Sequence, residues 1–266
     1  MKKFSTLFTF FLVFGLVANA QNDKKDFHSW APTPPMGWNS WDCYGPTVVE
    51  SEVKANADYM AAHLKKFGWE YIIIDIRWYV NNDKSHGYNE KDPSFVMDEY
   101  GRFLPSPVRF PSSANGAGFK PIADYIHSRG LKFGFHLMRG IPREAVKRNT
   151  PVLGSRVKAG DIYNEKLLCK WLKDMCTVDY QKEGAQEYYN SLFDLYASWG
   201  VDFIKIDDLS SPYHQGEIEL IRKAIDQTGI KNILTDEQVS KLKIGDLLKD
   251  ELQTPLIYSS SKAENL

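Results

Sequence analysis

The segment 200–208, GVDFIKIDD, carries the residues best suited to chemistry, with Lys205, Asp207 and Asp208 at the end of an apolar run. Alternate residues of a strand share one face, so Lys205 and Asp207 are expected to point the same way. A nearby ammonium keeps a carboxylate ionised, and an ionised carboxylate can act as a nucleophile. The alternatives are a structural salt bridge for this pair and a loop or helix-cap position for Asp208.

Two further polar residues, Asp75 and His136, stand near the C-terminal ends of the apolar segments 69–76 and 131–138. In a parallel sheet these ends meet at one edge, so both side chains are expected near Asp207. Considered by itself, His136 is equally consistent with a core histidine whose hydrogen bonds are satisfied. The equivalent positions of Asp75, His136 and Asp207 favour a functional site.

Strand-like and helix-like segments alternate along the chain. Strand-like segments cover about 34–41, 69–76, 131–138 and 200–208, and helical spacing marks 49–66, 120–130, 184–200 and 214–229. This order predicts an α/β fold with a parallel sheet covered by helices. A doubly wound sheet and a (β/α)8 TIM barrel both satisfy it. No G-x-G-x-x-G follows the first strand, and long loops (81–118, 139–179) follow the polar strand ends, which favours the barrel.

Composition excludes several classes of protein. The 266 residues have a formal net charge of −1 and are 43% hydrophobic, a globular balance without the basic excess of a nucleic-acid-binding protein. Residues 1–20 combine Lys2 and Lys3 with a short apolar run and an ANA ending, which predicts a signal peptide cleaved after Ala20. No other stretch is long enough to span a membrane. We therefore expect a secreted or periplasmic protein that is free of the membrane after cleavage.

Export permits disulfide bonds, and the chain has three cysteines. Cys169 and Cys176 are close enough in sequence to bridge a loop, or they form two buried thiols; at least one cysteine stays without an intramolecular partner. Their spacing without a supporting histidine is a weak metal signal. The sequence indicates no oligomeric state.

Four ordered motifs, PPMGWNSWD, YIIIDIRWY, LKFGFHLMRGIP and WGVDFIKIDD, together resemble glycoside hydrolase family 27, the α-galactosidase family of clan D. The resemblance covers about residues 34–229. It implies a (β/α)8 catalytic barrel and retaining hydrolysis by two aspartates. It also implies a carbohydrate partner, galactose-like residues at the ends of oligo- or polysaccharides. The chemistry requires no cofactor and no metal ion.

The resemblance assigns roles to individual residues. Asp207 matches the nucleophile of the family's K-x-D motif, and Lys205 matches the lysine that touches the sugar. Trp41 matches a tryptophan that packs against the sugar, although a core position is its alternative. Asp75 matches the first of two consecutive aspartates that bind galactose hydroxyls, and His136 falls where the family often has a tyrosine. Two further substrate-binding candidates at the barrel mouth are Arg77 and Trp78.

Two departures from the family pattern bear on function. Where the family has two consecutive aspartates, this chain has Asp75 and Ile76. Loss of a polar partner for one sugar hydroxyl can favour a different sugar, and β-L-arabinopyranoside is a candidate. After Gly229 the resemblance stops, so we expect four to five βα units, an N-terminal part of the barrel over 21–229, and a divergent tail over 230–266, truncated or frame-shifted. Asp236 and Glu237 lie there, but nothing identifies either as the acid/base, which is expected to be missing.

Two functional hypotheses remain. One is a secreted α-galactosidase-like hydrolase that carries its nucleophile, or, in a complete protein, a β-L-arabinopyranosidase. The other is an inactive remnant or a sugar-binding fragment. A metal site formed by Asp75, His136, Asp207 and Asp208 is a weaker alternative, because Lys205 beside Asp207 opposes a second cation.

Overall fold

The computed structural model describes residues 34–84 and 87–228. The predicted signal peptide and the tail 230–266, with Asp236 and Glu237, lie outside the described residues. Within them the sheet consists of four parallel strands in the order β1 (Gly37–Asn39), β2 (Tyr71–Ile74), β3 (Lys132–Met138) and β7 (Phe203–Asp207). Each strand leads into a covering helix, so four βα units of the barrel are present, which confirms the α/β prediction of an incomplete (β/α)8 fold.

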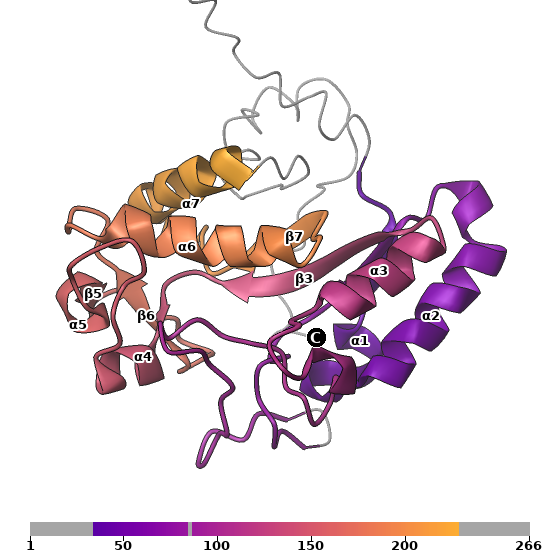
Figure 1. Cartoon of the computed structure of the whole chain (residues 1–266), viewed down its shortest axis with the longest axis horizontal. Helices are drawn as coiled ribbons and strands as arrows, with labels where there is room; N and C mark the ends of the chain where they lie inside the picture. The colour runs from indigo at the N-terminus through magenta and orange to yellow at the C-terminus, as the bar shows by residue number, and fades with distance from the viewer. Residues whose placement is uncertain (1–33, 85–86, 229–266) are drawn as a thin grey trace, which may run out of the picture.

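The covering helices form two groups (Figure 1). In one group α2 (Glu50–His63) packs on β2 and on α3 (Lys120–Ser128), and α3 packs on β3. In the other group α6 (Ala185–Ser198) packs along α7 (Gln215–Thr228). Each of these helices differs by four residues or fewer from the range predicted from apolar spacing. The largest difference is at α2, where a short 3-10 turn, η3 (Lys65–Phe67), replaces the last helical turn before Gly68.

The two faces of the sheet differ because strand side chains alternate. One set of alternate residues, including Ile72, Phe135 and Ile204, is fully buried against the helices. The other set points into the barrel interior and includes Gly134 and Lys205. Across Gly134 the rings of Tyr71 and Phe203 lie 5.4 Å apart. A Cβ atom on Gly134 would lie 2.7 Å from the carbonyl oxygen of Phe203, so this close approach requires glycine.

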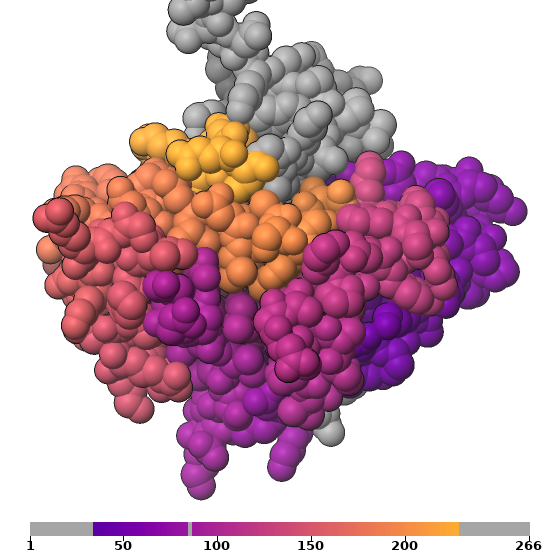
Figure 2. Space-filling model, viewed as in Figure 1, coloured from indigo at the N-terminus to yellow at the C-terminus, as the bar shows by residue number. Residues whose placement is uncertain are grey.

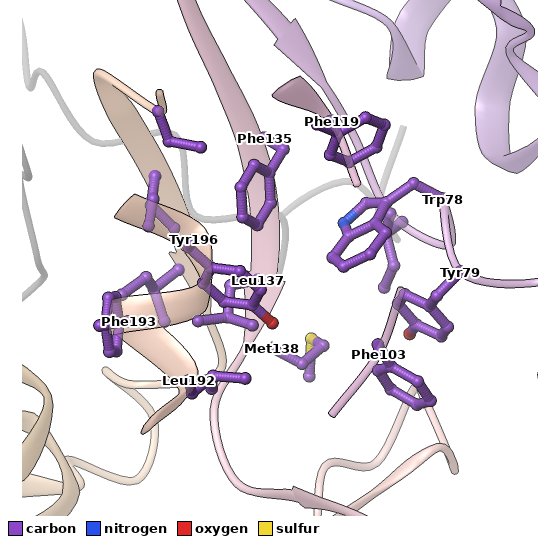
Figure 3. Close-up of a cluster of buried hydrophobic side chains, with 14 of the residues drawn as sticks. Trp78, Tyr79, Phe103, Phe119, Phe135, Leu137, Met138, Leu192, Phe193 and Tyr196 are labelled. Carbon is purple, nitrogen blue, oxygen red and sulfur yellow. The ribbon is translucent and has the colours of Figure 1, made fainter. Parts of the chain in front are cut away.

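Aromatic side chains dominate the core on the helix-covered side (Figure 3). The Trp78 ring makes edge-on contacts with Phe119, Phe135, Tyr196 and Trp199, at centroid distances of 5.2 to 6.4 Å. Its indole N–H donates to the carbonyl oxygen of His136 at 2.7 Å. These contacts tie the loop after β2 to β3 and to both groups of helices.

The segment 139–179, expected to be irregular, contains a small antiparallel sheet. Its strands are β4 (Ile141–Pro142), β6 (Met175–Val178) and β5 (Tyr163–Asn164), in that order, with α4 (Arg143–Arg148) and α5 (Ala159–Ile162) between them. β4 and β5 have two residues each and β6 has four, too few to show a clear periodicity, which explains why sequence patterns missed them. The remaining short elements are α1 (Trp41–Tyr44), η2 (Gly45–Thr47) and η4 (Pro111–Ser113).

The two tryptophans Trp78 and Trp41 are expected to differ sharply in their effect on stability. Trp78 is 1% exposed and packed on all sides, so Trp78→Leu removes contacts and leaves a cavity; we expect a loss of about 3 kcal/mol in the free energy of unfolding. Trp41 is 36% exposed, so Trp41→Leu is the matched control, with a change below about 1 kcal/mol. Urea unfolding followed by circular dichroism measures both. Equal losses would contradict the assignment of Trp78 alone to the core.

Candidate active site

The C-terminal edge of the four-stranded sheet brings two carboxylates around one ammonium. The Lys205 Nζ lies 3.0 Å from Asp75 Oδ2 and 3.6 Å from Asp207 Oδ2. The strand register places His136 opposite Lys205 and Met138 opposite Asp207. Asp75 directly follows β2, two strands away from β7, so the long lysine side chain crosses above β3. The structure thus brings together the predicted site residues Asp75, His136, Lys205 and Asp207.

Asp75 is held from several directions. The Asn39 side-chain amide at the end of β1 donates to Asp75 Oδ2 at 2.7 Å, and the Ile76 N–H donates to Oδ1 at 2.7 Å. The Asp75 N–H donates to the hydroxyl of Ser40 at 2.8 Å. Together with Lys205 on β7, these contacts bring the ends of three strands, β1, β2 and β7, to one buried carboxylate. Asn39 and Ser40 were missed by the sequence analysis, although both belong to the quoted motif PPMGWNSWD.

The charges of the cluster support one another. Burial by itself raises the pKa of Asp75, but the charges of His136 and Lys205 and the hydrogen bonds from Ile76 and Asn39 lower it below its usual value. Burial acts to lower the pKa of Lys205, but Asp75 and Asp207 raise it above the usual value. Asp75 is therefore a carboxylate and Lys205 an ammonium at neutral pH.

His136 contacts the carboxylate of Asp207. Its Nε2 lies 2.9 Å from Asp207 Oδ2, the oxygen that also faces Lys205, and the imidazole is fully buried. A carboxylate oxygen can only accept a hydrogen bond, so Nε2 of His136 carries the hydrogen and donates it to Asp207. The sequence analysis placed His136 against the substrate. The structure places its imidazole against Asp207, where it orients the carboxylate.

Trp41 lies beside this cluster at the start of α1. Its backbone N–H donates to Asn39 Oδ1 at 2.9 Å, and its ring lies 5.8 Å from the ring of Tyr88. Tyr88 in turn stacks on the guanidinium of Arg77 at 5.0 Å. Burial raises the pKa of Tyr88, and the negative charge of Asp75 raises it further. Tyr88 was not predicted, because it stands in a polar loop without periodicity.

Arg77 and Trp78, expected at the mouth, have other positions. Arg77 makes a bidentate pair with Asp174, both bonds at 2.8 Å, and donates to Asp83 at 2.7 Å. Its guanidinium is thus committed to joining the loop after β2 to the segment before β6. Trp78 lies in the aromatic core on the helix-covered side, away from the carboxylates. Both side chains are engaged within the protein, and direct contact of either with a substrate stays a prediction.

Asp208 faces away from Asp207 into a second buried ion network. Its backbone is left-handed, with φ of 68°, and its carboxylate lies 2.8 Å from the Arg139 guanidinium. Arg139 also donates to Glu217 on α7 at 3.0 Å. Burial raises the pKa of both Asp208 and Glu217, although Arg139 opposes the shift. This position fits the alternative given for Asp208, a residue of a loop without a role in the chemistry.

The three cysteines are free thiols, so no bridge joins Cys169 to Cys176. Burial raises the pKa of Cys169 to about 11, and the negative charge of Asp208 adds to it. This thiol is therefore protonated and unreactive at neutral pH.

Within residues 34–84 and 87–228, no group of three or more His, Cys, Asp or Glu side chains is arranged to hold a metal ion. The helices of the same residues include none with the length and apolarity of a membrane span.

The strand order and the covering helices define an incomplete (β/α)8 barrel, and known proteins narrow the class further. No protein-family model matches the chain. It is 31% identical over 197 residues to α-galactosidase A of Cellvibrio japonicus, covering 74% of this chain and 35% of the relative. It is 29% identical over 179 residues to α-galactosidase 3 of Arabidopsis thaliana, covering 67% of this chain and 29% of that one.

Solved structures give closer matches. The chain is 56% identical, with a TM-score of 0.75, to a GH27 β-L-arabinopyranosidase variant of Geobacillus stearothermophilus crystallised with arabinose, covering 79% of this chain and 49% of that one. It is also 56% identical to a putative α-N-acetylgalactosaminidase of Bacillus halodurans, with a TM-score of 0.72, covering 76% and 48%. The resemblance to glycoside hydrolase family 27 is confirmed. The chain spans about half the length of these solved structures and about a third of the curated relatives.

The cluster predicts an acid-dependent stability. Because the pKa of Asp75 is lowered in the folded chain, its ionised form stabilises the fold above about pH 3.9, the unfolded value, and this contribution is lost as the pH falls through the folded pKa. Between about pH 5 and pH 3 we expect the wild-type free energy of unfolding to fall more steeply than that of Asp75→Asn. Urea unfolding at each pH measures this. Asp124→Asn, at an exposed pair on α3, is the control that retains the wild-type slope.

Proposed function

We propose that the chain carries the nucleophile-bearing part of a retaining glycoside hydrolase that acts on terminal galactose-like residues of oligo- or polysaccharides. The observation that carries the proposal is the Asp207 carboxylate, held at the barrel mouth through one oxygen by His136 and Lys205. Both contacts favour the ionised form and fix the orientation that a nucleophile needs. The glycoside hydrolases among the relatives support this chemistry.

The mechanism follows from this geometry. Asp207 attacks the anomeric carbon while the bond to the leaving oxygen breaks, and that oxygen takes a proton from an acid. Water then cleaves the glycosyl-enzyme ester with the same group acting as base. Lys205 and Asp75 offer a donor and an acceptor to the sugar hydroxyls, and the half-exposed Trp41 ring offers an apolar surface to the sugar face.

The acid/base is not Asp75. A general acid must be protonated before it acts, which requires a raised pKa, whereas His136 and Lys205 lower the pKa of Asp75. Asp208 and Glu217 have raised pKa values, but both are paired with Arg139 away from Asp207. None of these three acidic groups suits the role.

β-L-Arabinopyranose is a second candidate sugar. It shares the ring configuration of α-D-galactopyranose and lacks the exocyclic hydroxymethyl group. Where the family has its second aspartate, the chain has Ile76, which is 2% exposed and supplies no polar partner. The arabinopyranosidase relative, solved with arabinose, supports the same choice.

A glycosyl fluoride tests Asp207 without the acid, because fluoride leaves with little proton donation. Incubated with α-D-galactopyranosyl or β-L-arabinopyranosyl fluoride, the chain is expected to form a covalent ester, located at Asp207 by peptide mass spectrometry. Without a strong base the ester hydrolyses slowly and accumulates. Asp207→Asn is expected to form no adduct, and Asp124→Asn to form it normally. An adduct on another carboxylate would refute the assignment of Asp207.

Ile76 is expected to influence the choice of sugar. If it replaces a hydroxymethyl-binding aspartate, β-L-arabinopyranosyl fluoride labels the chain roughly tenfold or more faster than the galactosyl fluoride. Ile76→Asn restores a polar side chain and is expected to narrow this ratio. The ratio of initial labelling rates within one protein cancels differences in the folded fraction. Faster labelling by the galactosyl fluoride would favour α-galactosidase specificity.

A further inference from the structure

A pocket of about 380 Å³ lies next to the carboxylate cluster but is not lined by it. Its walls come from the loop after β2, which includes Phe95, and from the segment 143–176, which includes Tyr163. These two segments lie side by side in Figure 2 and are joined by a 2.9 Å ion pair between Lys173 and Glu90. Both follow C-terminal ends of parallel strands, so the walls of the pocket start from the same edge of the sheet as Asp207.

The pocket and the cluster share a wall. Arg77 lines the pocket and stands two residues after Asp75, within about 7 Å of backbone. The Arg77 guanidinium stacks on Tyr88, whose ring contacts Trp41. Contacts through Tyr88 and Arg77 therefore connect the position proposed for the terminal sugar, at Trp41, to this pocket.

The lining identifies the chemistry of the ligand. Four cationic and four acidic side chains line the pocket, so their charges cancel and favour neither an anion nor a cation. Six of these eight are already paired, as Lys173–Glu90 (2.9 Å), Lys147–Glu144 (3.9 Å) and Arg77–Asp174 (2.8 Å). The other two, Arg143 and Glu165, are exposed.

Arg143 and Glu165 point to a polyhydroxylated ligand. Their side chains have no ion-pair partner among the described residues, and both line the pocket together with Cys176. A guanidinium and a carboxylate together bind vicinal hydroxyls, as donor and acceptor. The rings of Phe95 and Tyr163 offer the apolar surface that a sugar face requires.

We propose that this pocket binds the neutral sugar units on the leaving-group side of the scissile bond, with Arg143 and Glu165 contacting hydroxyls and Tyr163 stacking on a ring. The proposal rests on the proposed function of the carboxylate cluster. It assigns specificity for the leaving saccharide to the segment 143–176, which is separate from the residues that contact the terminal sugar.

Binding of neutral oligosaccharides that lack a terminal galactose or arabinose tests the pocket independently of hydrolysis. Mannotriose, xylotriose and maltotriose are titrated into the full chain by ligand-observed NMR, with trigalacturonate as the charged comparison. We expect one neutral trisaccharide to bind, and Tyr163→Ala or Glu165→Gln to weaken it about tenfold. Tyr59→Ala, at an exposed tyrosine on α2 outside the pocket, is the control that is expected to have no effect.

The outcomes separate the two proposals. Unchanged binding by Asp207→Asn, together with failure of the labelling experiment, would refute the nucleophile and keep the pocket as a sugar site. No binding of any neutral trisaccharide at about 20 mM by a chain with a cooperative unfolding transition would overturn the pocket proposal. Tighter binding of trigalacturonate, or equal loss with Tyr59→Ala, would overturn it as well. Glu165→Gln changes an exposed side chain, so it remains informative where Tyr163→Ala fails to fold.

Discussion

The ammonium of Lys205 is the contact on which the site depends. Two buried carboxylates at one sheet edge repel each other, and without a cation one of them would take up a proton. Lys205 lies within 3.6 Å of both, and its charge lowers the pKa of Asp75. It also joins β7 to the end of β2 across β3, so the same contact sets the electrostatics and the spacing of the strand ends. An uncharged side chain at this position would undo both.

The alternation of side chains along each strand separates the polar residues of the site from the apolar residues of the core. Residues of one parity in β3 and β7 meet the helices through Phe135 and Ile204, and residues of the other parity present His136, Lys205 and Asp207 to the barrel interior. A shift of one residue in register would exchange these sets and bury the charges among aromatic rings. The aromatic core around Trp78 therefore fixes the chemistry indirectly, because it allows only one register.

Much of this arrangement was predictable from local patterns. Strand periodicity placed Lys205 and Asp207 on one face, and helical spacing located α2, α3, α6 and α7. The patterns failed where contacts are made between segments far apart in sequence. Arg77 and Trp78 stand two and three residues after Asp75, and contacts with Asp174 and Phe135, which are distant in sequence, determine where their side chains lie. Tyr88 and Arg139 gave no signal, because their partners lie on other loops and on α7.

The ion network of Arg139 has a consequence for motion. The Arg139 N–H donates to the carbonyl oxygen of Asp207 at 3.3 Å, while its guanidinium binds Glu217 on α7. Through Arg139, hydrogen bonds thus connect the backbone of the proposed nucleophile to a helix on the outside of the sheet. Local opening of α7 would expose a buried charge and release the strand end at the same time. We therefore expect the order of this peripheral helix and the alignment of the proposed nucleophile to be gained and lost as one cooperative unit.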